Sequence, residues 1–125
     1  WQQCDAAAVT FARAQALAPA RVDWWYLGGL VDAARAMPAE AARQFARALP
    51  LAGADAPLVR LRHADALLAA GADDEATASY RALTSLPEYA AAAWYGLGRV
   101  ALRRQDDAAA RQALLAAVER YAEFG

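Results

Sequence analysis

The sequence predicts an all-α protein of about seven helices that pack as antiparallel pairs in an α-solenoid. Two observations support this prediction. Apolar residues recur at steps of three and four along most of the chain, which places them on one face of each helix. The same pattern also returns at offsets of 34 and 35 residues, so one helix-pair unit is repeated. Such a solenoid buries apolar surface between neighbouring repeats rather than in one central core.

The repeat offsets define three and a half units. At an offset of 34 residues, Ala64 falls on Gly98 and Tyr80 falls on Leu114. The earlier unit aligns at 35 residues instead, and the extra residue fits the connecting segment 51–56. Within a single domain spanning 1–125, we therefore expect the second helix of a partial repeat at 2–20 and full repeats at 22–56, 57–90 and 91–124.

Proline, glycine and acidic residues delimit the individual helices. The first helix ends before Pro19, because proline disfavours a helical conformation in the residue before it. Pro38 and Pro57 suit the first turn of a helix, Gly71 suits a helix end, and Asp73 is expected to cap the next helix. Pro87 is expected to end that helix. From the N-terminus, these signals predict helices that begin at about Gln2, Val22, Pro38, Pro57, Asp73, Ala91 and Asp106.

The last helix pair has the clearest packing pattern. Gly98 and Ala110 allow the two backbones to approach closely, while Trp94 and Leu114 fill the space beside them. A glycine inside a helix costs about 1 kcal/mol relative to alanine, and a close contact explains its presence. The order of residues resembles the tetratricopeptide repeat (TPR), a helix-turn-helix unit of 34 residues, through Trp94, Leu97, Gly98, Ala101, Ala110, Leu114 and Ala117. The resemblance implies a right-handed superhelix.

Two positions depart from this pattern or leave it open. In the second full repeat, Arg60 and His63 stand where the third has Trp94 and Leu97. In the first full repeat, a stripe through Trp25 fits the repeat register, but a stripe through its neighbour Trp24 fits equally well. The sequence therefore does not decide which of the two indoles is buried.

Composition argues against nucleic-acid and membrane partners. The 13 basic residues, all arginine, are balanced by 14 acidic ones, for a net charge of -1 and a pI near 5.8. No apolar run approaches the roughly 20 residues that span a bilayer. We expect a soluble domain, cytoplasmic or periplasmic.

The sequence also indicates its origin. Lysine, asparagine and isoleucine are absent, which favours a GC-rich, bacterial genome. The first residue, Trp1, indicates a processed chain or a piece of a larger protein.

Catalytic and metal sites are not expected. His63 is the only histidine and Cys4 the only cysteine, and they fall in different repeats, so neither has partners for a metal site. The acidic residues at 73–75 and 106–107 begin second helices, where they complement the helix dipole. The sequence therefore predicts a protein without enzymatic activity, catalytic residues, metal or cofactor.

The resemblance to TPR proteins implies a scaffold that binds a segment of a partner protein in its concave groove. The residues of this chain that would line the groove are Tyr26, Leu30, Leu61, Arg62, Asp65, Tyr95, Arg99 and Arg103. Tyr26 and Tyr95 each follow a tryptophan by one residue, and about 100° of helical rotation turns them away from the interior. Arg99 and Arg103 are one turn apart, so a segment with an acidic group is favoured.

The alternative is a structural role, as one stretch of a longer solenoid or a unit that self-associates through its ends. The first helix lacks its partner, and the last has no polar helix behind it. Apolar residues around Phe11, Leu115 and Val118 are therefore expected to be covered by a neighbouring molecule in a homo-oligomer.

Overall fold

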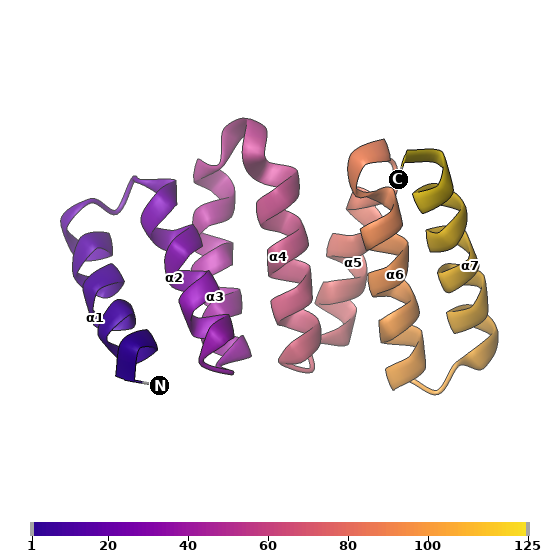
Figure 1. Ribbon diagram of the computed structural model, residues 1–125, viewed down its shortest axis with the longest axis horizontal. Helices are drawn as coiled ribbons and strands as arrows, with labels where there is room; N and C mark the ends of the chain where they lie inside the picture. Colours follow the sequence, from indigo (N-terminus) through magenta and orange to yellow (C-terminus); the bar gives the residue numbers. More distant parts are fainter. Residues whose placement is uncertain (1, 125) are drawn as a thin grey trace.

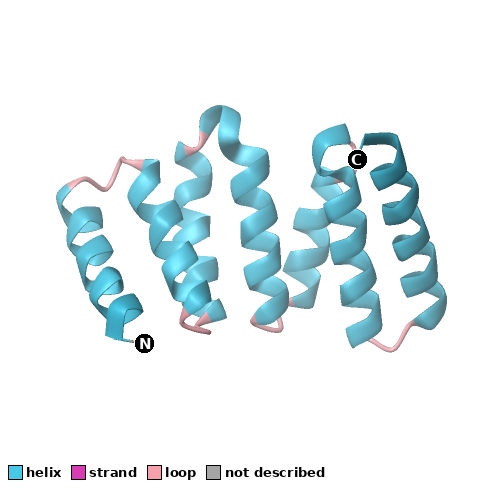
Figure 2. Cartoon of the chain, in the orientation of Figure 1, coloured by secondary structure: helices cyan, strands magenta, loops and turns pink. Residues whose placement is uncertain are grey.

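The computed structural model describes residues 2–124, which form seven α-helices and no β-strand (Figure 1; Figure 2). This confirms the predicted all-α class and the number of helices. Two short 3-10 turns, η1 (Leu49–Leu51) and η2 (Gly53–Asp55), connect the third helix to the fourth. The helices are α1 (Gln2–Leu17), α2 (Val22–Ala34), α3 (Pro38–Ala48), α4 (Ala56–Ala69), α5 (Asp73–Leu83), α6 (Pro87–Arg103) and α7 (Asp107–Phe124).

The helices stand in a row from α1 to α7, with the two ends of the chain at opposite ends of the row (Figure 1). Consecutive helices run in opposite directions and pack against each other, and α4 also packs against α6. Each of the inner helices α2 to α6 therefore packs between two neighbours, whereas α1 and α7 each pack against one.

The turns inside the helix pairs repeat one backbone geometry. A residue with a positive φ follows the first helix of each pair: Ala36 at 57°, Gly71 at 86° and Gln105 at 59°. In all three turns, its N–H bonds to the carbonyl three residues earlier, and the next N–H bonds to the carbonyl five residues earlier. This is the Schellman arrangement, which satisfies carbonyls at a helix end. The turns recur at 35 and then 34 residues, the offsets of the side-chain pattern.

Small and aromatic residues share the centre of the row. The side chains of Phe45 and Tyr80 are almost completely buried, as are Ala41 and Ala76. Between α6 and α7, a Cβ atom added at Gly98 would lie 2.6 Å from Leu114 Cδ2, well inside van der Waals contact. The close approach of these two helices therefore requires glycine at this position.

Both indoles of the Trp24–Trp25 pair are half-buried, on two sides of α2. The Trp24 ring lies 6.2 Å from the Phe11 ring on α1. Trp25 packs against a small cluster around Ala48 and Val59, and its Nε1 donates a hydrogen bond of 2.7 Å to the Pro19 carbonyl. Each tryptophan packs against a different neighbour, so the helix has an apolar stripe through each of them.

Several predicted boundaries were wrong by up to one helical turn. Helix α6 begins at Pro87 rather than at Ala91, because a proline that ends one helix also suits the first turn of the next. Asp73 lies inside the first turn of α5 and forms no capping bond, whereas Asp106 accepts one from the Ala109 N–H at 3.1 Å. Helix α7 continues past Tyr121 to Phe124.

Apolar side chains remain exposed on the two terminal helices. On α7, Leu115, Val118 and Tyr121 are all more than half exposed, as expected from the sequence. On α1 the exposed residues are Val9 and Leu17, whereas Phe11, which was expected to need cover, is already packed on Trp24. Among the described residues, no helix is long and apolar enough to cross a membrane.

Candidate functional site: a cavity between α2 and α4

Three of the predicted groove residues line one cavity. It has a volume of ≈ 420 Å³ and lies between α2 and α4, with α3 as its floor. We call it the α2–α4 cavity. Leu30 comes from α2, and Arg62 and Asp65 come from α4. The other lining residues are Ala33, Ala36, Pro38, Ala41, Phe45, Ala66 and Ala69.

The cavity exists because α2 and α4 do not pack together as α4 and α6 do. The connection from α3 to α4 includes both 3-10 turns, whereas only residues 84–86 separate α5 from α6. The walls carry small side chains, Ala33 on α2 and Ala66 and Ala69 on α4, which cannot fill the space between the two helices. An apolar depression with a few charged groups at its edge is the usual form of a ligand site.

Asp65 is fixed in place by a buried tyrosine. Tyr80 on α5 is fully buried, and its hydroxyl donates a short hydrogen bond to Asp65 Oδ1. Burial, followed by this bond and the negative charge of Asp65, raises the pKa of Tyr80 far above its ordinary value, and Arg99 opposes the shift. Gly96 makes room for the tyrosine ring, since a Cβ there would overlap it. The Asp65 carboxylate is therefore held by the core and is not free to turn toward a ligand.

Arg62 is the charged group of the cavity that is free to bind. Its side chain is exposed and forms no ion pair with any residue in the described range 2–124. Because the Asp65 carboxylate is engaged by Tyr80, Arg62 is the charged side chain at the edge of the apolar interior that is available to a ligand.

Tyr95 and Arg99 form a second exposed group, on α6. Tyr95 is 55% exposed, and the Arg99 guanidinium lies 5.8 Å from the centre of its ring. This distance suits a cation–π contact, which orients both side chains at the surface. Neither residue lines the α2–α4 cavity, so the pair is a separate contact surface beside it.

The Arg103 guanidinium is already engaged by groups of the chain itself. Its Nη1 donates a hydrogen bond of 2.8 Å to the Leu68 carbonyl, near the end of α4. Its Nε lies 3.4 Å from Asp73 Oδ1, at the start of α5. The guanidinium therefore joins α6 to the α4–α5 turn, a structural role that spacing along one helix does not reveal.

Tyr26 and Leu61 also have packing roles. Both are half-buried against the central core, and the Tyr26 ring lies 5.8 Å from the Phe45 ring. The expectation that Tyr26 turns away from the interior was wrong, because α3 and α4 both reach the side of α2 on which it lies.

The remaining polar candidates are dispersed. His63 is half-buried, and burial lowers its pKa, with an opposing effect from Glu75 and a further lowering by Arg60. Cys4 is free. Among the described residues, no three His, Cys, Asp or Glu side chains are grouped closely enough to hold a metal ion.

No protein-family model matches the chain, and no curated protein matches it either. Its function is therefore argued from the geometry above.

The sequence did not identify the floor of the cavity. Ala41 and Phe45 of α3 line that floor, and neither is among the predicted groove residues. The only sequence signal for a gap was the extra residue in the segment 51–56, which shifts the repeat offset from 34 to 35.

Proposed function

We propose that this chain is a helical-repeat scaffold, of the tetratricopeptide kind that its residues resemble, which binds a segment of a partner protein at the α2–α4 cavity. The observation that carries the proposal is the cavity itself, which has a volume of ≈ 420 Å³ and includes Leu30, Arg62 and Asp65. The proposed role is binding without catalysis.

The chemistry of the cavity defines the segment that fits it. The apolar interior over Phe45 and Ala41 suits one large apolar side chain, since burial contributes about 25 cal/mol per Å² of apolar surface. Arg62 at the edge suits a carboxylate on a neighbouring residue of the same segment. Tyr95 and Arg99, on α6, extend the surface for the rest of the segment. Tyrosine and arginine are enriched at binding hot spots.

The test is a substitution that fills the cavity and leaves the buried core residues unchanged. Ala69 lines the cavity but is exposed, so Ala69→Trp closes the opening, and Ala78→Trp on exposed α5 surface is the matched control. Peptides are selected on the wild-type protein from a random library displayed on phage, and their affinities are measured by fluorescence anisotropy. We expect peptides with an apolar and an acidic residue to lose about tenfold or more in affinity for Ala69→Trp and Arg62→Ala, but not for Ala78→Trp. If every selected peptide binds Ala69→Trp as tightly as wild type, the cavity is not the site.

The exposed terminal helices favour a second candidate function. Leu115 and Val118 on α7, and Val9 and Leu17 on α1, present apolar surface at both ends of the row. Repeat arrays need a polar outer face on their terminal units to remain soluble. In this reading the chain is one stretch of a longer array, or stacks on further copies of itself, and the cavity has no ligand.

A further inference from the structure

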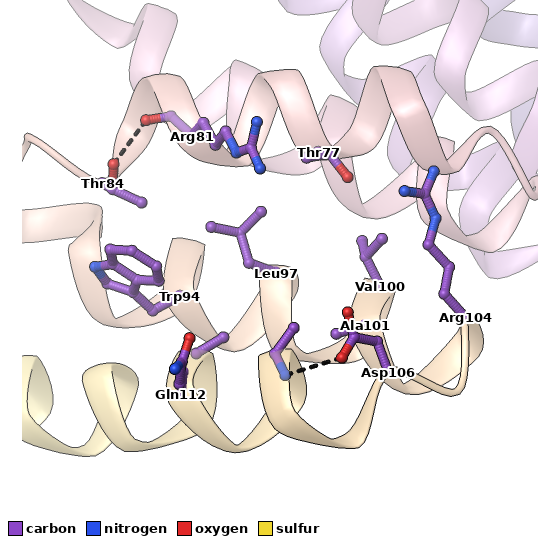
Figure 3. Close-up of a pocket in the computed structure, with 12 residues that line it drawn as sticks. Thr77, Arg81, Thr84, Trp94, Leu97, Val100, Ala101, Arg104, Asp106 and Gln112 are labelled. Carbon is purple, nitrogen blue, oxygen red and sulfur yellow. Dashed lines mark hydrogen bonds between the residues drawn. The ribbon is translucent and has the colours of Figure 1, made fainter.

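A second depression lies between α5 and α7, with α6 as its floor (Figure 3). We call it the α5–α7 trough. Its volume is ≈ 390 Å³, which is within the usual size of ligand pockets. It shares no residue with the α2–α4 cavity, so it is independent of the proposed function. Figure 3 shows Thr77, Arg81 and Thr84 on one wall, Trp94 and Leu97 on the floor, and Gln112 on the other wall.

The floor of the trough is apolar and its walls are polar. Val100 is buried, and Trp94 and Leu97 are half-buried beside it. On the α5 wall, the Thr77 and Thr84 hydroxyls donate to backbone carbonyls of α5, at 2.8 and 2.7 Å. The trough therefore offers an apolar strip with a row of polar side chains on the α5 wall and Gln112 on the α7 wall, which suits a peptide better than a purely apolar ligand.

The Trp94 indole has an unused hydrogen-bond donor. Its Nε1 atom is buried and has no acceptor, whereas Nε1 of Trp25 donates to the Pro19 carbonyl. Leaving a buried donor without an acceptor costs about 1–3 kcal/mol, and such groups are rare. An acceptor supplied by a bound segment, after a small rotation of the ring, removes this cost.

The ionic groups of the trough leave one cation without a partner. Two arginines and one aspartate line it. Arg104 is paired with Asp74 across the α5–α6 interface, and Asp106 caps α7. Arg81 forms no ion pair with any of residues 2–124, the part of the chain that the structure describes, although it stands over the floor near Leu97 (Figure 3). The trough therefore favours an acidic occupant.

We propose that the α5–α7 trough binds an extended, acidic segment of a partner protein, with a carboxylate at Arg81 and an apolar side chain over Trp94 and Leu97. In an extended chain, alternate residues point to opposite sides, so residues two apart reach the trough together.

The experiment is a selection from a random twelve-residue peptide library on phage, followed by affinity measurements on three proteins. Arg81→Glu reverses the charge in the trough, and Arg62→Glu makes the same change in the α2–α4 cavity. We expect a class of acidic peptides whose affinity falls by about tenfold or more for Arg81→Glu and is unchanged for Arg62→Glu. In two-dimensional NMR spectra, these peptides should shift the indole N–H signal of Trp94, identified by its absence in Trp94→Phe.

Three outcomes would overturn the proposal. One is a selection in which no peptide is enriched, and another is a set of peptides that bind Arg81→Glu as tightly as wild type. The third is self-association that Arg81→Glu abolishes, because a second copy of the chain would then be the occupant. Peptides that respond only to Arg62→Glu would support the α2–α4 cavity and contradict the trough, so the two proposals fail separately.

Discussion

Single residues determine how closely the helices approach one another. Ala76 on α5 is fully buried, and the next residue but one, Ala78, is exposed. Ala76→Leu should therefore lower the free energy of unfolding by about 1–3 kcal/mol, because the added carbons have no space. Ala78→Leu should change it by less than about 0.5 kcal/mol. Urea denaturation of both variants measures the difference, and equal stabilities would mean that Ala76 is not at a close contact.

His63 is predicted to make stability depend on pH. Burial lowers the pKa of His63 below its ordinary value of 6.5. Below about pH 6.5, the unfolded chain therefore binds more protons at this residue than the folded chain does, and the free energy of unfolding falls as pH falls. His63→Gln should lose less stability than wild type between about pH 8 and about pH 5. Parallel stability curves for the two proteins would contradict this.

At the residue scale, the sequence predicted what helical spacing alone controls. It placed Tyr80 and Gly98 at packing positions of the repeat, because each depends only on its register within one helix. It missed hydrogen bonds that long side chains form with residues on other helices. The buried Gln15 is one example, since its amide donates to the Trp24 carbonyl and to Gln44, at 2.9 Å in each case.

At the scale of the element, the three Schellman turns carry different residues at the same strained position. Only Gly71 is a glycine, whereas Ala36 and Gln105 hold φ values of 57° and 59° with a side chain. A left-handed conformation costs a non-glycine residue about 1–2 kcal/mol. Replacing such a residue with glycine removes this cost, but part of the gain in stability is lost because glycine makes the unfolded chain more flexible.

Substitutions at these turn positions are predicted to change the free energy of unfolding in opposite directions. Gln105→Gly should raise the free energy of unfolding by roughly 0.5–1 kcal/mol, and Gly71→Ala should lower it by about 1 kcal/mol. Ala46→Gly, at an exposed position within α3, is the control and should be destabilising by about 1 kcal/mol. Thermal unfolding followed by circular dichroism measures all three, and a destabilising Gln105→Gly would rule out strain at this turn.

Element boundaries were predicted less well than element identity, for a physical reason. Helix α5 ends at Leu83 and Pro87 begins α6, and the sequence contains no signal for how few residues lie between them. The α2–α4 cavity was missed for the same kind of reason. It depends on the distance between two helices that are not adjacent in sequence and pack on each other less closely than α4 and α6 do.

At the scale of the whole molecule, the two proposed binding sites and the proposed self-association lie on different parts of the row of helices. The α2–α4 cavity and the α5–α7 trough both lie between alternate helices, over the helix that separates them in sequence. Arg103 and Arg104 link α6 to the start of α5, through Asp73 and Asp74. Such links between neighbouring pairs hold α6 against α5 beside the α5–α7 trough, which favours binding there without a large rearrangement.

The last prediction concerns the ends of the row. Val118 on α7 is 67% exposed, beside Leu115 and Tyr121, and Val9 on α1 is 64% exposed. Apolar surface of this kind is expected to be covered by a second copy at high protein concentration. Sedimentation velocity should show species larger than the monomer, which Val118→Glu abolishes because a charge cannot be buried there without a partner. Val118→Leu keeps the apolar surface and should retain the association. A wild-type protein that stays monomeric at every concentration would contradict the structural alternative and leave peptide binding as the remaining candidate function.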